Sequence, residues 1–240
     1  MSREYEGRTN IKKGVAVFFI LFILLAIVSC ISLYRRYKKA QFDYADHLAD
    51  TVLQVNNEGI TLRRFGYYIY TVEDFVQKQA LLYDPDDPIR YWNVHFAAGM
   101  DSVFMRDYAR KIALEVCVRD MIYAQLARKE GYTLSAEDEQ KAFEKANTVF
   151  NGMNAAQKEA TGVTREDVLS VEREKLLGEM YVTDYVMSHD VTGYGDAPQN
   201  ALSYDGAYYL QVVKPQHSVV LNEELIQRID MGTITVNRED

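Results

Sequence analysis

The cysteines and histidines are the residues of this sequence whose side chains most often bind metals or act as nucleophiles and bases. The chain has two cysteines and four histidines, and the histidines are His47, His95, His189 and His217. They lie far apart, without the spacing of a zinc site and without a nucleophile beside them. Cys117 stands in an apolar-rich segment and is expected to be a small buried hydrophobe. We therefore expect no catalytic residue, no metal and no cofactor.

Cys30 is a candidate for covalent lipid attachment, because Ile27-Val28-Ser29-Cys30 resembles the lipobox of bacterial lipoproteins. The competing interpretation is an uncleaved transmembrane helix. The 21 residues from Gly14 to Tyr34 carry no charge and would span about 30 Å as a helix. A cleaved secretory signal fits less well, since its apolar core is shorter and ends at a small-residue cleavage site. The apolar run continues past Cys30, which favours the transmembrane helix, and in both interpretations the chain is anchored to a membrane.

The charge is distributed unevenly along the chain. Residues 41–240 hold 19 basic and 33 acidic residues, a net charge of −14. Such a domain repels nucleic acid and anionic lipid headgroups, so we expect no nucleic-acid partner. Four basic residues precede the apolar run and four follow it, so the excess of positive charge that usually marks the cytoplasmic side does not orient the span.

Aromatic residues are unusually frequent, with 18 tyrosines and one tryptophan. They could simply pack the core. The alternative is that some of them line a surface for unfolded chains, because an aromatic ring combines apolar area with a polar tip and loses little rotamer entropy on binding. The candidates for contact with such a client are Tyr67, Tyr68, Tyr70, Tyr91 and Trp92.

Two long helices are predicted in the first half of the soluble part. A short strand over Val52–Val55 and the turn NNEG precede Thr61, which stands where a helix cap belongs. The next residues predict an amphipathic helix with one apolar face made of Phe65, Tyr68, Ile69, Val72, Phe75 and Val76. A longer helix is predicted from about residue 102 to 130, ending at Gly131, with an apolar face of Tyr108, Ile112, Val116, Tyr123 and Leu126.

Two capping boxes predict the next helix starts, at Ser135 and at Thr164, each followed by Asp at the third helical position. The first helix carries Phe143, Ala146, Val149 and Phe150, the second runs toward Met187, and AAQKEATG between them forms at most two turns. The end of the chain changes character. Residues 208–213 alternate as a strand does, Asn222 is a cap candidate for a helix over 223–231, and TITV at 233–236 is β-branched. We expect strands at the two ends of this part to pair with one another.

Three stretches together resemble the N-terminal chaperone domain of the SurA and PrsA foldases. They are VNNEGIT at 55–61, GYTLSAEDE at 131–139 and TGVTREDV at 161–168, in the family's order and at about its spacing. The resemblance implies that residues 41–240 are extracytoplasmic and bind unfolded or secreted polypeptides. Many family members also carry a parvulin-type prolyl isomerase domain. Here YYLQVVK resembles the closing strand of that domain, but residues 188–207 are too few to hold the rest of it.

The predicted organisation is therefore mainly α: an N-terminal transmembrane helix, then a SurA-like helical domain with small terminal strands. The predicted parts are a cytoplasmic segment 1–13, the span 14–34 (or a lipoprotein signal to residue 29), a linker 35–50, the chaperone domain 51–187 and a strand and helix segment 188–240. The expected function is a membrane-tethered chaperone without isomerase activity. The alternatives are a degenerate prolyl isomerase and a structural or adaptor subunit of a cell-envelope complex. The sequence does not indicate the oligomeric state.

Overall fold

The computed structural model describes residue 25 and residues 27–31, 42–96, 102–194 and 197–236. The chain divides into a unit of residues 1–43 and a compact unit of residues 44–240. Most of the predicted span 14–34 lies outside the described residues. Among the residues that are described, no helix is both long and apolar enough to cross a membrane. Cys30 lies in a short helical segment and is an exposed free thiol.

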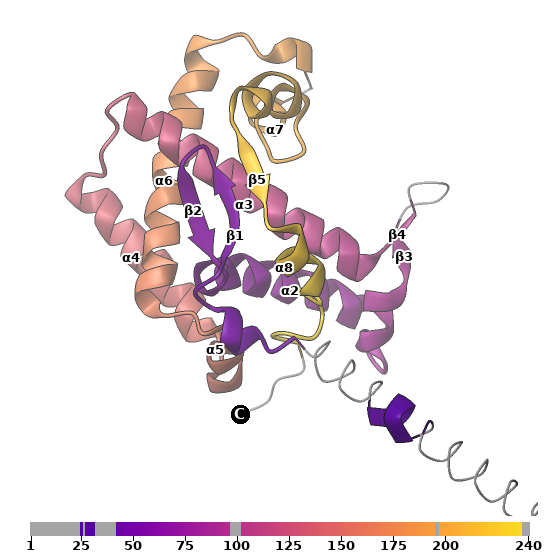
Figure 1. Ribbon diagram of the computed structural model, residues 1–240. Helices are drawn as coiled ribbons and strands as arrows, with labels where there is room; N and C mark the ends of the chain where they lie inside the picture. Colours follow the sequence, from indigo (N-terminus) through magenta and orange to yellow (C-terminus); the bar gives the residue numbers. More distant parts are fainter. Residues whose placement is uncertain (1–24, 26, 32–41, 97–101, 195–196, 237–240) are drawn as a thin grey trace, which may run out of the picture. The chain divides into compact units, whose positions relative to one another are not determined.

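The compact unit is mainly helical with few strands, as predicted (Figure 1). Its elements in chain order are η1 (Tyr44–His47), β1 (Thr51–Val55), β2 (Glu58–Thr61), α2 (Leu62–Tyr83), η2 (Pro88–Asn93), β3 (His95–Phe96), β4 (Val103–Phe104), α3 (Met105–Lys129), α4 (Ala136–Gly152), α5 (Ala155–Thr161), α6 (Arg165–Ser188), η3 (Thr192–Tyr194), α7 (Pro198–Ala201), η4 (Tyr209–Val213), η5 (Lys214–Gln216), β5 (Val219–Leu221) and α8 (Glu223–Arg228).

The start of the compact unit corrects the predicted linker 35–50. Residues 44–47 already form η1, and the Tyr44 hydroxyl donates to the Leu62 carbonyl at 3.0 Å. The amide of Leu62 in turn donates to the Asp50 carbonyl at 2.8 Å. These bonds attach the segment before β1 to the first turn of α2, so the residues from Tyr44 onward belong to the folded unit.

The helix starts predicted at Thr61, Ser135 and Thr164 are confirmed. They can be predicted from the sequence because a cap needs hydrogen bonds only between residues that are close in the chain. The Thr61 side chain accepts from the Arg64 amide at the start of α2. Ser135 and Thr164 form complete capping boxes with Asp138 and Asp167. Asp at this position closes the box as Glu would, because each carboxylate reaches back to the amide of the cap residue. A third box, which the sequence analysis did not find, starts α5 with Asn154 and Gln157.

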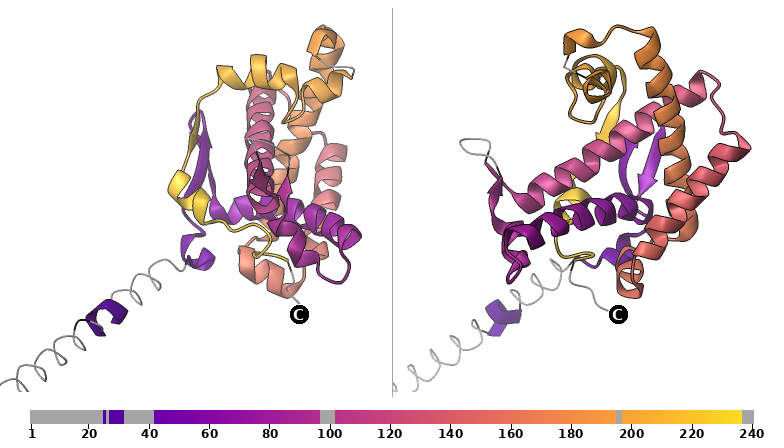
Figure 2. Two further views of the ribbon diagram at one scale, coloured as in Figure 1. Left: turned by 90° about the vertical axis from the view of Figure 1, so that its right-hand side faces the viewer. Right: turned by 180° about the vertical axis from the view of Figure 1, so that it is seen from behind.

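Helix α3 is the central packing element, with α6 running along it (Figure 2). Small residues make the close approach of the two helices possible. A Cβ added at Gly178 of α6 would lie 3.0 Å from Cβ of Tyr123, and Ala109, Ala113 and Cys117 of α3 are fully buried. The predicted end of α3 is confirmed, since Gly131 takes a φ of +84° immediately after the helix.

The predicted apolar faces of the helices are correct only in part. On α2 the predicted residues are buried apart from Phe75, which is exposed. On α3 the predicted Tyr123 is buried, whereas Tyr108, Ile112, Val116 and Leu126 are only half-buried. Phe143 on α4 is exposed as well. Periodicity locates an apolar face, but neighbouring elements determine how much of that face is covered.

A three-stranded antiparallel sheet joins the two ends of the compact unit and stands as one layer against the helices (Figure 2, left). Its order is β2-β1-β5, with Leu53 opposite Leu221 and Val55 opposite Val219. The expectation that terminal strands pair is therefore confirmed, but with residues 219–221 rather than either predicted segment. The predicted strand over 208–213 is wrong. These residues form the π-helix η4, which buries Tyr209 and exposes Leu210. The predicted likeness of YYLQVVK to a closing strand is wrong for the same reason.

The segment that contains TITV binds the core without forming a strand. The Glu73 carboxylate of α2 is fully buried and accepts from the amides of Gly232 at 2.5 Å and Thr235 at 2.6 Å, and from the Thr235 hydroxyl. The Ile234 amide lies 3.4 Å from the same carboxylate. Burial raises the pKa of Glu73, and these hydrogen bonds act in the opposite direction. Because the backbone donors point at one carboxylate, they are not available for a strand ladder.

Candidate functional site

The five aromatic residues predicted to contact a client occupy very different surroundings. The exposed fractions of Tyr67, Tyr68 and Trp92 are 3%, 2% and 1%, whereas Tyr70 and Tyr91 are half-buried. A role that needs an accessible ring is therefore not supported for Tyr67, Tyr68 and Trp92. These three rings belong to the core, in agreement with the alternative interpretation that the aromatic residues pack the interior.

Each of the three buried rings has a structural partner for its polar atom. The Tyr67 hydroxyl donates to Glu172 and accepts from the Lys175 amine at 2.7 Å. Burial, followed by the nearby Glu172 charge, raises the pKa of Tyr67, so this phenol stays protonated at neutral pH. The indole Nε1 of Trp92 donates to Gln77 at 2.9 Å. Buried polar atoms that are satisfied in this way stabilise the packing of the helices.

The Tyr68 hydroxyl lies 3.4 Å from the carboxylate of Asp120 on α3. Burial raises the pKa of Asp120 to about 6, although Arg119 at 2.9 Å favours the charged form. Cys117 is buried one helical turn before Asp120, and burial raises the pKa of its thiol. Cys117 is therefore buried, as predicted, and its surroundings favour the protonated thiol.

The histidines form no common site. His47 bonds Asp50, His95 bonds Ser102, His189 stacks on Tyr185, and His217 lies 3.1 Å from the side-chain nitrogen of Asn56. Among the described residues, no group of three or more His, Cys, Asp and Glu side chains is placed to hold a metal ion.

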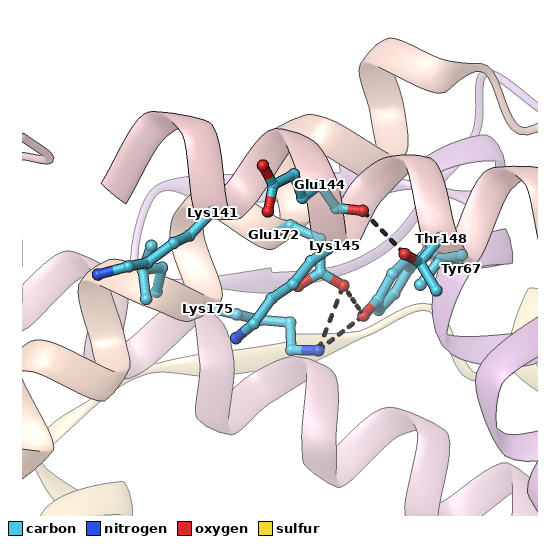
Figure 3. A pocket seen from close by; sticks show the side chains of 9 residues that line it. Tyr67, Lys141, Glu144, Lys145, Thr148, Glu172 and Lys175 are labelled. Carbon is cyan, nitrogen blue, oxygen red and sulfur yellow. Dashed lines mark hydrogen bonds and ion pairs between the residues drawn. The ribbon is translucent and has the colours of Figure 1, made fainter. Parts of the chain in front are cut away.

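A pocket of about 570 Å³ lies between α4 and α6, with Tyr67 of α2 at its wall (Figure 3). Three amines and two carboxylates face it, together with Val149 and Leu176; these charged residues are Lys141, Lys145, Lys175, Glu144 and Glu172. Figure 3 shows Glu172, Lys175 and the Tyr67 hydroxyl in mutual contact. This pocket could not be predicted from the sequence, because its lysines come from two separate helices, α4 and α6.

The ion pairs of this pocket limit its chemistry. Lys175 pairs with Glu172 at 3.5 Å, Lys145 with Glu179 at 3.5 Å, and Lys141 with Glu137 at 2.7 Å. Each amine thus already has a carboxylate partner. The pocket can exchange such pairs with a polar ligand, but its strong Tyr67–Glu172–Lys175 contacts serve mainly to hold α2 against α6.

A second surface is apolar and lies where α2 ends and the hairpin β3–β4 begins. We call it the apolar end. It consists of exposed side chains from α2, η2 and the hairpin, namely Phe75, Leu81, Leu82, Tyr83, Ile89, Phe96, Val103 and Phe104. Figures 1 and 2 show the C-terminal part of α2, η2 and the hairpin at the same end of the unit. The half-buried Tyr91 joins this surface, since its ring centroid lies 5.3 Å from that of Tyr83.

Protein-family models, curated proteins and solved structures contain no match to this chain. The resemblance to the SurA and PrsA chaperone domain therefore stays a prediction. Function has to be argued from the surfaces of the compact unit. Of the five predicted contact residues, only Tyr91 belongs to the apolar end, while Tyr70 lies on α2 with its hydroxyl 3.2 Å from the Cβ position of Gly152. The signal that could have found the apolar end is the run of apolar residues without helical period after residue 80.

Proposed function

We propose that the compact unit binds unfolded segments of secreted polypeptides, as a chaperone that keeps them from aggregating. In this proposal the apolar run 14–34 tethers the unit to the membrane, and the unit works on the extracytoplasmic side. No isomerase step is part of the proposal. The sequence resemblance to the SurA and PrsA chaperone domain supports it, and so does the apolar end.

The observation that carries the proposal is the exposure of large apolar side chains at the apolar end. Leu82 is 79% exposed, and seven further large apolar side chains of α2, η2 and the hairpin are exposed at the same end of the unit. Single exposed apolar residues are ordinary on soluble proteins, whereas a gathering of large apolar side chains at one end of a unit is a candidate interaction surface. Since each fully buried side chain of this size contributes about 1.5 to 3 kcal/mol, covering a few of them is enough for weak, sequence-tolerant binding.

The proposal is tested with the full-length chain and a chemically unfolded client protein. We expect the chain to delay aggregation of the client, as followed by light scattering. Replacing Leu82 and Phe104 together by Ser should weaken this effect, because both side chains are exposed at the apolar end. The matched control replaces Val220 and Leu221 of β5 by Ser, since these two are also exposed but lie outside the apolar end.

Two outcomes would overturn the proposal. Turnover in a tetrapeptide isomerisation assay would show that the chain is an enzyme. Failure to delay aggregation of any client, together with crosslinking to one stoichiometric partner in the native membrane, would favour the structural-subunit alternative.

A further inference from the structure

Strand β5 lies at one edge of the three-stranded sheet, beside β1 (Figure 1). In an antiparallel pair, every second residue directs its N–H and C=O groups away from the partner strand. The Ser218 carbonyl accepts from the Asn56 amide at 2.7 Å, and the Asn222 amide donates to a β1 carbonyl at 2.9 Å. Residues of this alternation bond β1, so Val219 and Leu221 direct their main-chain groups to the other side of β5. We call this side the open edge.

The rest of the unit leaves the open edge uncovered. Within the part of the chain that the structure describes, no strand pairs with this side of β5. Leu53 of β1 and Leu221 lie directly opposite one another, and therefore on the same face of the sheet. Leu53 is 1% exposed and Leu221 is 36% exposed, so the helices stop covering this face at β5. On the other face, Val220 is 57% exposed.

The opposite edge of the sheet, formed by β2, has features that usually keep a further strand from pairing. Glu58 places a charge in β2 and pairs with Arg128 at 2.6 Å. The register between β1 and β2 also shifts next to Thr51. In contrast, β5 has the sequence VVL, without charge or proline, and its described pairing with β1 is regular. Of the two edges, the open edge is thus the one that a further strand can join.

The chemistry of the open edge specifies its occupant. Val219 and Leu221 each present one amide donor and one carbonyl acceptor along an extended backbone. The complement of this row is the main chain of another extended polypeptide, which adds to a sheet edge as a further strand. Main-chain groups are the same in every sequence, so this pairing tolerates many sequences. Because only two residues take part, the pairing is short and therefore readily reversible.

A second copy of this chain fits the open edge less well than an unfolded segment does. Residues 41–240 carry a net charge of −14, so two compact units repel each other when their edges meet. An unfolded segment can follow the edge without bringing a second unit of like charge against it. The charge of the unit therefore favours an unfolded client.

We infer that the open edge of β5 binds an extended segment of an unfolded client as an additional strand of the sheet. The inference rests on the proposed function and adds how the main chain of the client is recognised. The apolar end contacts apolar side chains of the client, and the open edge binds its backbone. The double variant V220S/L221S keeps every main-chain group of β5, so it remains the control for the apolar end.

The test uses the full-length chain and two fluorescent peptides of alternating Thr and Val, read by anisotropy. The second peptide carries N-methyl groups on all its central residues, which removes the main-chain donors and leaves the side chains unchanged. We expect the unmethylated peptide to bind about tenfold more tightly, because the methylated one cannot donate to the Val219 and Leu221 carbonyls. L82S/F104S should keep this preference, since it leaves the open edge unchanged.

A variant of the protein tests the same contact from the other side. V219P removes one outward donor and places the proline ring on the open edge, a position at which edge strands tolerate proline. It should reduce the preference for the unmethylated peptide to less than about threefold. The matched control V220T changes the exposed side chain of the next residue, leaves the main-chain groups in place, and should keep the preference. Circular dichroism shows whether V219P retains its helical content, and the peptide comparison on the unaltered chain does not depend on it.

Four results would overturn the inference. Equal binding of the two peptides, or no binding of either by a chain that delays client aggregation, would exclude strand addition and leave the proposed function standing. A preference that V219P does not change would place the peptide elsewhere. Dimers of the chain that V219P dissociates and the peptide does not, measured by sedimentation velocity, would assign the open edge to a second copy. No peptide binding together with no effect on client aggregation would refute the proposed function as well.

Discussion

The buried carboxylate of Glu73 provides the most direct test of how the C-terminal segment is held. Replacing Glu73 by Ala removes the acceptor for the amides of Gly232, Ile234 and Thr235. Each buried amide that is left without a partner costs about 1 to 3 kcal/mol. The loss is partly offset, because burial raises the pKa of Glu73 and the substitution relieves the cost of burying its charge. We expect a net loss of about 3 kcal/mol in the free energy of unfolding.

The assay combines chemical denaturation with amide hydrogen exchange. The first gives the free energy of unfolding, and the second shows whether the amides of Gly232 and Thr235 lose protection before the rest of the unit. Asp74 is the matched control, since it is the next residue of α2, is only half-buried, and pairs with Lys78 at 2.6 Å. D74A should change stability by less than about 0.5 kcal/mol. If E73A behaves like D74A in both measurements, the Glu73 hydrogen bonds do not hold the segment, and the reasoning is refuted.

Three further predictions concern single residues. The folded-state pKa of Asp120 is raised from 3.8 to about 6, so its stabilising contribution is fully present below pH 3.8 and is lost as the pH rises through about 6. The free energy of unfolding should therefore fall by up to about 3 kcal/mol over this pH range, and D120N should remove this pH dependence. An unchanged pH dependence of D120N in denaturation at several pH values would contradict the prediction. G232A should cost at least about 2 kcal/mol, because the residue has a φ of +88° and an added Cβ would lie 2.4 Å from the Trp92 ring; an unaltered denaturation midpoint would argue against this contact. T164A should cost about 1 kcal/mol, since its hydroxyl accepts from the Asp167 amide at 3.2 Å, and thermal melting measures the loss.

The parts of the fold that depend on residues close together in the chain could be predicted from the sequence. The capping boxes at Ser135 and Thr164 and the left-handed stop at Gly131 each need only a few consecutive residues. The segment 208–213 could not be predicted in this way, because its alternation fits a strand while the unit uses it as a helix with Tyr209 buried.

Which aromatic side chains are exposed could likewise not be predicted from local sequence. Trp92 was predicted to meet a client, but its ring packs against Gly232, which is 140 positions later in the chain. Phe75 was predicted to be buried by its place in the helical period, yet no described element covers it and it is exposed. Burial of an aromatic residue depends on which distant segment returns to it, and that information is not contained in local periodicity.

The pairing of β1 with β5 has a consequence for the order in which the unit can fold. Val55 and Val219 face each other across the sheet and are 164 positions apart in the chain. Closing a loop of that length in an unstructured chain costs about 4.5 kcal/mol of entropy, so the contact forms late, after the intervening helices have shortened the distance. During synthesis or export from the N-terminus, one side of β1 therefore has no strand partner until residues 219–221 have emerged. A chain that ends before residue 219 keeps that side open to other strands, and we expect such fragments to associate with one another rather than remain monomeric.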